Sequence, residues 1–247
     1  MKDKYFGDIH DFLKYTLLRF LQDRMQWSIF INWMLTTYEP RNSKKENKDG
    51  GQLNYEKLRS INEDIFQSLA PYRIPGAKRS VMEFKNLCPS VLNNTIQAFE
   101  KDYVYEEIVP PKSSNSRNLI SERIKWCSEF YQKSKDFDLV FFDSDNGLQV
   151  DSIPLGQSKA CKYVFLKEIK CIFERKQNVL LYQHRNRQKY DVQLDIKKKQ
   201  LSQLLPNPHI SVFNGKGTFF LLATHSEDQA QDISELSVEW NNRLSSI

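Results

Sequence analysis

Residues 137–148 read Phe-Asp-Leu-Val-Phe-Phe-Asp-Ser-Asp-Asn-Gly-Leu, a short apolar run followed by a polar turn. The aromatic and branched side chains of 137–142 form the pattern of a strand that is buried on both faces, as in the centre of a parallel sheet. This strand ends at Asp143, where Ser-Asp-Asn-Gly is typical of a turn. Carboxyl ends of parallel strands are where open α/β sheets bind ligands, so Asp143, Asp145 and Asn146 are candidate catalytic residues. The alternative is an Asx-type turn that only closes the strand.

Predicted strands and helices alternate on both sides of this segment. Apolar runs predict further strands over 28–35, 178–182, 209–213 and 218–224, and the Asn-Gly-Lys-Gly between the last two is typical of a hairpin. Apolar periodicity predicts helices over 9–24, 55–70, 89–100, 116–133, 162–176 and 191–205. This alternation favours an α/β fold with a doubly wound, Rossmann-like and mostly parallel sheet that ends in a C-terminal antiparallel hairpin.

The length and composition fit one large core. With 247 residues, of which 40% are hydrophobic and 13% aromatic, the chain is expected to form a single domain over 1–247. A helical insertion is expected around 52–133. The segment 36–51 is rich in Asn, Lys, Ser and Gly, which predicts a long polar loop.

Composition also bears on location and partners. Charges interrupt every apolar stretch before about 18 residues, and the chain opens without a signal peptide, so we expect a cytoplasmic protein with no membrane partner. The four cysteines lack Cys-x-x-Cys spacing, which predicts reduced, buried thiols. A net charge of +5 permits RNA or DNA as a partner without demonstrating one.

A second polar cluster lies at the start of the chain. Residues 5–15 read Tyr-Phe-Gly-Asp-Ile-His-Asp-Phe-Leu-Lys-Tyr, in which charged side chains alternate with apolar ones that a helix would bury. Both polar clusters lie at the ends of expected core elements, so they are predicted to form one site. Its candidate ligand-binding residues from this segment are Asp8, His10, Asp11, Lys14 and Tyr15.

A third cluster, Gln183-His184-Arg185-Asn186-Arg187, follows the predicted strand 178–182 and is expected at the same sheet edge as Asp143. His184 has an ordinary pKa near neutrality, so it is a candidate general base or phosphate ligand. Gln183, Arg185 and Arg187 are candidate substrate-binding residues, since the forked donors of arginine match phosphate. A surface or capping role for His184 is the alternative.

The sequence resembles known families, both in its opening segment and over nearly its whole length. Residues 7–18 resemble the Gly-Asn-x-x-Asp-x-x-Lys-His-x-x-Leu opening of the ribosomal-RNA adenine-N6 methyltransferases that act on large-subunit RNA, and also the opening of the three-Cys-motif partner proteins. Nearly the whole chain is similar to an uncharacterised bacterial family with Tyr-Phe-Gly-Asp (here 5–8), Asp-x-Asp-Asn-Gly-Leu (143–148) and Gln-His (183–184).

The resemblance to the methyltransferases implies a class I methyltransferase-like fold with an S-adenosylmethionine site lined by the opening helix. By position, Asp11, Lys14 and Tyr15 would lie at that site, with Asp8 and His10 beside them. Asp143 matches the first residue of the Asp-Pro-Pro-Tyr motif of those enzymes, and Ser144-Asp145-Asn146 replaces the rest. A Gly-x-Gly turn after the first strand is also missing.

Three hypotheses follow for function. The first is an S-adenosylmethionine-dependent methyltransferase that acts on nucleic acid. The second is a Mg²⁺-dependent nuclease or phosphoesterase in which Asp8, Asp143 and Asp145 bind the cation and His184 serves the attacking water. The third is a non-catalytic module of the same fold that binds RNA, DNA or a partner protein, because fold alone does not fix function.

Overall fold

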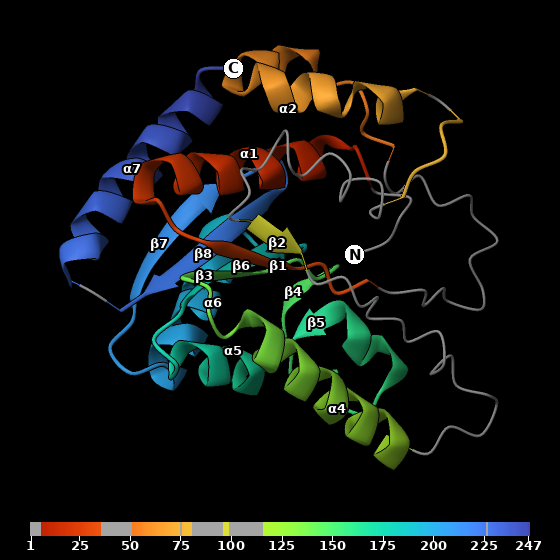
Figure 1. Ribbon diagram of the computed structural model, residues 1–247, viewed down its shortest axis with the longest axis vertical. Coiled ribbons are helices and arrows are strands. Elements are labelled where there is room, and N and C mark those ends of the chain that lie inside the picture. Colours follow the sequence, from red (N-terminus) through yellow and green to blue (C-terminus); the bar gives the residue numbers. More distant parts are fainter. Residues whose placement is uncertain (1–5, 36–50, 75, 81–95, 99–115, 226) are drawn as a thin grey trace.

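A computed structural model of the chain describes residues 6–35, 51–74, 76–80, 96–98, 116–225 and 227–247 (Figure 1). Its central sheet has the strand order β2-β1-β3-β6-β8-β7. The strands are β1 (Ile29–Asn32), β2 (Ile96–Ala98), β3 (Leu139–Phe142), β6 (Asn178–His184), β7 (His209–Asn214) and β8 (Thr218–Thr224). β1, β2, β3 and β6 pair in parallel, and β8 runs antiparallel to both β6 and β7. The protein is therefore an α/β fold with a mostly parallel central sheet and mixed strand order.

Helices cover both faces of this sheet (Figure 1). The longer ones are α1 (Ile9–Met25), α4 (Ser116–Ser134), α5 (Leu166–Phe173), α6 (Tyr190–Leu204) and α7 (Glu227–Ser245). The side chains of Leu139 and Phe141 in β3 join the core beneath α1 and α7, whereas Val140 and Phe142 join the core beneath α4, α5 and α6. This alternation explains why the whole strand had to be apolar.

Shorter elements complete the chain. The helix α2 (Glu63–Ser68) lies between the 3₁₀ turns η2 (Glu56–Ile61) and η3 (Ala70–Arg73), and a third 3₁₀ turn, η4 (Ser158–Lys162), precedes β5. A small second sheet pairs β4 (Gly147–Leu148) with β5 (Tyr163–Val164) in parallel. The segment from η2 to α2 packs its apolar residues against α1, so α1 is buried on most sides, charged residues included.

The register places three strand ends side by side. Asn32 at the end of β1 is opposite Phe142 of β3, and Phe142 is opposite Leu181 of β6. β6 continues through Gln183 and His184 before it ends. Residues that follow β1 and β3, together with the last residues of β6, therefore share one edge of the sheet.

Several predicted elements differ from the structure. The helix expected over 55–70 is divided into η2, α2 and η3, because Asn62 caps a helix that begins at Glu63, and a 3₁₀ turn begins at Ala70 with Pro71 near its start. The helix expected over 89–100 is wrong for residues 96–98, which form β2; 89–95, 99 and 100 lie outside the described residues. The helix expected over 162–176 begins only at Leu166, and α7 was not predicted.

The predicted insertion over 52–133 contributes β2 to the central sheet and α4 to one of its faces. Most of the polar loop expected over 36–51 lies outside the described residues. Among the helices that the structure describes, none is long and apolar enough to span a membrane.

Candidate functional site

A buried charge cluster lies at the carboxyl end of β3 and consists of Asp8, Asp11, Lys14 and Asp143. The Nζ atom of Lys14 lies 2.7 Å from Oδ1 of Asp143 and 3.2 Å from Oδ1 of Asp11. Asp11 and Asp143 are fully buried, and Asp8 and Lys14 are nearly so. The structure thus brings the polar clusters at the start and in the middle of the sequence into direct contact.

The start of α1 positions three of these side chains. Asp8 is the N-cap, and its Oδ1 accepts hydrogen bonds from the backbone N–H groups of His10 and Asp11. Asp11 in the first turn accepts the N–H of Gly7 and the ammonium of Lys14. The spacing of three residues between Asp11 and Lys14 places both on one face of the helix.

Burial sets the electrostatics of the cluster. It raises the pKa of Asp8 to about 6 and that of Asp11 to about 8, although Lys14 opposes both shifts. Burial alone would lower the pKa of Lys14, but the carboxylates of Asp143 and Asp11 raise it well above its ordinary value. Lys14 is therefore a permanent cation at physiological pH, and Asp11 carries a proton over much of that range.

Two buried polar groups at this edge of the sheet keep hydrogen-bonding capacity. Among the described residues, the buried Nδ2 of Asn32 has no hydrogen-bond acceptor, and the Asp143 carboxylate has no hydrogen-bond donor besides its ion pair with Lys14. The backbones of these two residues are joined by a 2.9 Å hydrogen bond from Asp143 N to Asn32 O. Buried polar groups without partners are rare in proteins and point to a ligand.

These groups lie where the chain changes direction within the sheet. From β1 the chain reaches β2 on one side and then returns past β1 to β3 on the other. Ligands in open α/β sheets bind at such a switch point, outside the carboxyl ends of the strands.

Tyr15 and His10, which were also predicted to bind a ligand, lie outside the charge cluster. Tyr15 is fully buried in the core beneath α1. The His10 ring lies 6.1 Å from that of His184 and 6.5 Å from that of Tyr182, and burial lowers its pKa to about 4. His10 is therefore neutral at physiological pH.

Tyr182 connects the cluster to His184. Its ring lies 4.5 Å from the Lys14 ammonium, and its hydroxyl is 3.4 Å from Nδ1 of His184. Burial raises the pKa of the Tyr182 hydroxyl. The His184 side chain is exposed, so it is the solvent-facing end of a path that leads inward to Lys14 and Asp143.

Asp145 and Asn146 lie in the turn after β3, and Asp145 has a different cationic neighbour from Asp143. Asp145 is near Lys162, with 3.9 Å between Oδ2 and Nζ, whereas Asp143 pairs with Lys14. The hydroxyl of Ser144 accepts the N–H of Gly147 and closes the turn. No set of three or more His, Cys, Asp or Glu side chains in the described ranges is arranged to hold a metal ion.

Gln183 has a structural role that its sequence position did not predict. Its Oε1 accepts the N–H of Leu148, and its Nε2 donates to the carbonyl groups of Asn146 and His184. The carboxamide therefore fixes the turn after β3 to the end of β6. These three hydrogen bonds use the Oε1 and Nε2 atoms of Gln183 within the protein. The Asp-x-Asp-Asn-Gly-Leu and Gln-His segments are thus parts of one structure.

Gly147→Ala is expected to destabilise the protein by about 2–3 kcal/mol, because a Cβ there would lie 2.5 Å from Oε1 of Gln183 and the backbone has a φ of +93°. Gly217→Ala is the matched control, since Gly217 has a φ of +73° but open space around it. Urea unfolding of both variants checks this prediction. Equal losses would mean that the contact with Gln183 is unimportant.

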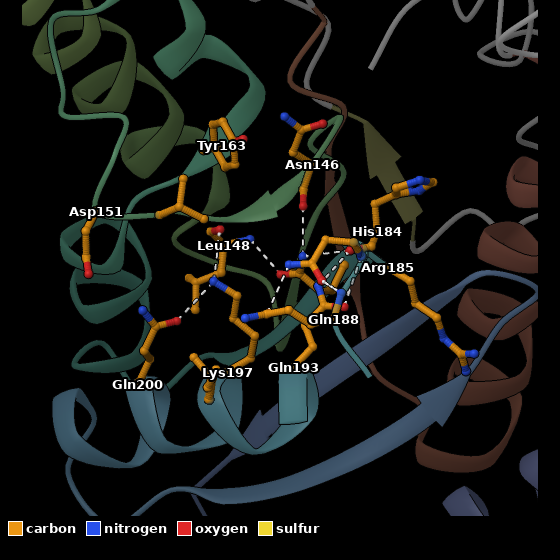
Figure 2. Close-up of a pocket in the computed structure, with 14 residues that line it drawn as sticks. Asn146, Leu148, Asp151, Tyr163, His184, Arg185, Gln188, Gln193, Lys197 and Gln200 are labelled. Carbon is orange, nitrogen blue, oxygen red and sulfur yellow. Dashed lines mark hydrogen bonds between the residues drawn. The ribbon is translucent and has the colours of Figure 1, made fainter. Parts of the chain in front are cut away.

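A pocket of about 470 Å³ lies beside His184 (Figure 2). Its lining includes Asn146, Gln183, His184 and Arg185, so it brings together residues predicted from two segments. The Arg185 guanidinium lies 4.1 Å from the Tyr190 ring centroid. Arg187, two residues along, is exposed.

Sequence reasoning missed several residues of these sites, among them Asn32, Tyr182 and Lys197. Asn32 and Tyr182 lie within predicted strands. The available signal for each was a side chain with a polar group inside an apolar run. Lys197 is buried although it belongs to a run of three lysines, a pattern that is typical of a solvated helix face.

Comparisons of the chain with protein-family models, with curated proteins and with solved structures gave no significant match.

Proposed function

We propose that this chain is an S-adenosylmethionine-dependent methyltransferase that acts on nucleic acid. The observation that carries the proposal is the 2.7 Å contact between Lys14 and Asp143. Lys14 comes from the segment that resembles the opening of the RNA methyltransferases, and Asp143 matches the first residue of their strand-end motif. The two residues lie 129 positions apart in the sequence.

The sheet supports the same proposal. An antiparallel strand, β8, lies between β6 and β7, which resembles the end of the sheet in class I methyltransferases. Helices on both faces fit a doubly wound arrangement.

The residues at the switch point fit the polar end of S-adenosylmethionine, which carries an amino group, a carboxylate and a sulfonium cation. Asp143 would accept from the amino group, while Lys14 and the unpaired Nδ2 of Asn32 would hold the carboxylate. When bound, this cofactor supplies an electrophilic methyl group. His184, exposed at the same edge, would accept the proton that a nitrogen or hydroxyl substrate releases on methylation.

The cationic neighbours of Asp143 and Asp145 favour this proposal over the metal-dependent alternative. Asp143 faces Lys14 and Asp145 lies near Lys162, so each carboxylate has its own cationic neighbour. A Mg²⁺ ion shared by the two would compete with both lysines.

Calorimetric titration with S-adenosylmethionine tests the proposal. We expect micromolar binding by the unmodified protein and a loss of about 10- to 100-fold in Asp143→Asn, which removes one charge-assisted interaction. Asp136→Asn is the matched control, because Asp136 is exposed and precedes β3 at its opposite end. Thermal unfolding of each variant verifies folding. Absence of binding by the unmodified protein would refute the proposal.

A further inference from the structure

The pocket beside His184 is built at the carboxyl end of β6, next to the buried charge cluster but outside it. Its walls come from the turn after β3, from β4 and β5, and from α6, whose Gln193 and Lys197 point toward Leu148 and His184 in Figure 2. A volume of about 470 Å³ is within the ordinary range for small-ligand sites.

Three buried side chains hold the inner wall of this pocket in place. Gln183 bridges the turn and β6 as described above, and Gln193 donates to His184 O and accepts from Asn186 N. The ammonium of Lys197 donates to the carbonyl groups of Leu148 and Gln149 at 3.4 and 3.0 Å. The pocket is therefore preformed and does not need a ligand to order it.

Other lining groups are left to bind a ligand. The side-chain carboxamide of Asn146 and the hydroxyl of Tyr163 form no hydrogen bond within the part of the chain that the structure describes. Gln200 uses its Oε1 for Lys197, which leaves its Nε2 as a donor. Carboxamides and hydroxyls are neutral groups that match the edges of nucleobases and the hydroxyls of ribose.

A positively charged loop borders the pocket on one side, and Asp151 lines it on another. The loop 185–189, which we call the basic loop, reads Arg-Asn-Arg-Gln-Lys and has three cations and no acidic residue. Arg185 lines the pocket and lies over the Tyr190 ring, and its side chain is directed away from Asp151 and Gln200 in Figure 2. Arg187 and Lys189 are exposed beside the pocket and do not line it. A stacked arginine presents its forked donors to phosphate at low entropic cost, whereas these cations would repel the sulfonium of S-adenosylmethionine.

We propose that this pocket binds one unpaired nucleotide of a nucleic-acid strand, with the base and ribose among the carboxamides and the phosphate on the basic loop. A base within a duplex cannot enter such a pocket unless it leaves the stack, so single strands or flipped nucleotides are the ligands. This inference rests on the proposed function and names the form of its substrate. His184, which lines the pocket, would then lie next to the bound nucleotide, whereas the buried Asp143 lies deeper at the same sheet edge.

Fluorescence anisotropy with a labelled 12-nucleotide single strand, as RNA and as DNA, tests the pocket. The variant Arg185→Gln/Arg187→Gln is expected to bind the preferred strand at least about tenfold more weakly. The matched control is Lys135→Gln/Lys176→Gln, which removes two exposed cations that precede β3 and β6 at the opposite sheet edge. Its affinity is expected to change less than about threefold.

A second variant tests the cavity without changing charge. Ile196→Trp, at a partly exposed lining position on α6, would fill the pocket and is expected to weaken binding about tenfold. Unchanged binding by Ile196→Trp, or equal losses in the two double variants, would overturn the inference, as would absent binding of both strands. Titration of the same proteins with S-adenosylmethionine separates the two proposals, since the pocket variants should keep cofactor affinity even if strand binding is lost.

Discussion

Lys14→Met is expected to lower the free energy of unfolding by about 3–5 kcal/mol at neutral pH, because it removes one partner of a buried ion pair. Asp143 would lose its ion-pair partner at 2.7 Å, and Asp11 would lose its partner at 3.2 Å. Methionine nearly fills the volume of the lysine stem, so little of the loss comes from a cavity. The midpoint and slope of urea unfolding give the measurement.

Arg24→Met provides the matched control on the same helix. Arg24 forms an ion pair with Glu239 at the surface, so its replacement is expected to change stability by less than about 1 kcal/mol. The loss in Lys14→Met should also be larger above about pH 8, where Asp11 is ionised in the unmodified protein and needs a cation. Similar small losses in both variants would show that the cluster contributes no stability.

Much of the central sheet could be predicted from local pattern. The run 137–142 is apolar at every position except Asp138, and it became the buried centre of the sheet because β3 faces helices on both sides. Residues 96–98 could not be assigned in this way, because they form a strand through pairing with β1, which is distant in sequence. The missed helix α7 does carry a signal, since Ile233, Leu236 and Trp240 form one apolar stripe.

Part of the site could also be predicted from local sequence pattern. Charged residues inside apolar segments marked Lys14 and Asp143 as members of one cluster, and the structure confirms their contact. Sequence could not reveal that Asp145 would lie near a different lysine or that Gln183 would hold the turn, because both depend on how β4 and β5 pack beside β6. The expected methyl donor and nucleic-acid substrate stay proposals.

The thermal midpoint of the protein is expected to fall by about 4–8 °C between about pH 6.5 and 8.5, because Asp11 must ionise inside the fold. Its pKa is raised by burial to about 8, whereas the unfolded chain has the ordinary value near 3.8. A carboxyl group with a raised pKa stabilises the fold at low pH, and that stabilisation is lost as the pH rises through the folded-state pKa. Over this interval the loss amounts to about 2 kcal/mol.

Two other members of the site act mainly below this interval. Asp8, with a pKa raised to about 6, loses its stabilising effect as the pH rises through that value. His10, with a pKa lowered to about 4, has the opposite effect, since its contribution is lost as the pH falls below about 6.5. Their effects oppose each other between about pH 4 and 6, so the fall above pH 6.5 is assigned to Asp11 within this cluster.

Asp11→Asn isolates that assignment. The amide is neutral at every pH, and its oxygen can still accept one of the two hydrogen bonds that Asp11 receives from Gly7 and Lys14. Lys14 keeps Asp143 as its counterion, so the variant is expected to fold. Calorimetric scans should show a nearly flat midpoint from pH 6.5 to 8.5 in Asp11→Asn and an unchanged slope in Asp23→Asn, an exposed substitution on the same helix. A slope that persists in Asp11→Asn would place the titrating group elsewhere and would mean that Asp11 is ionised throughout this range, which changes the charge that the site offers to S-adenosylmethionine.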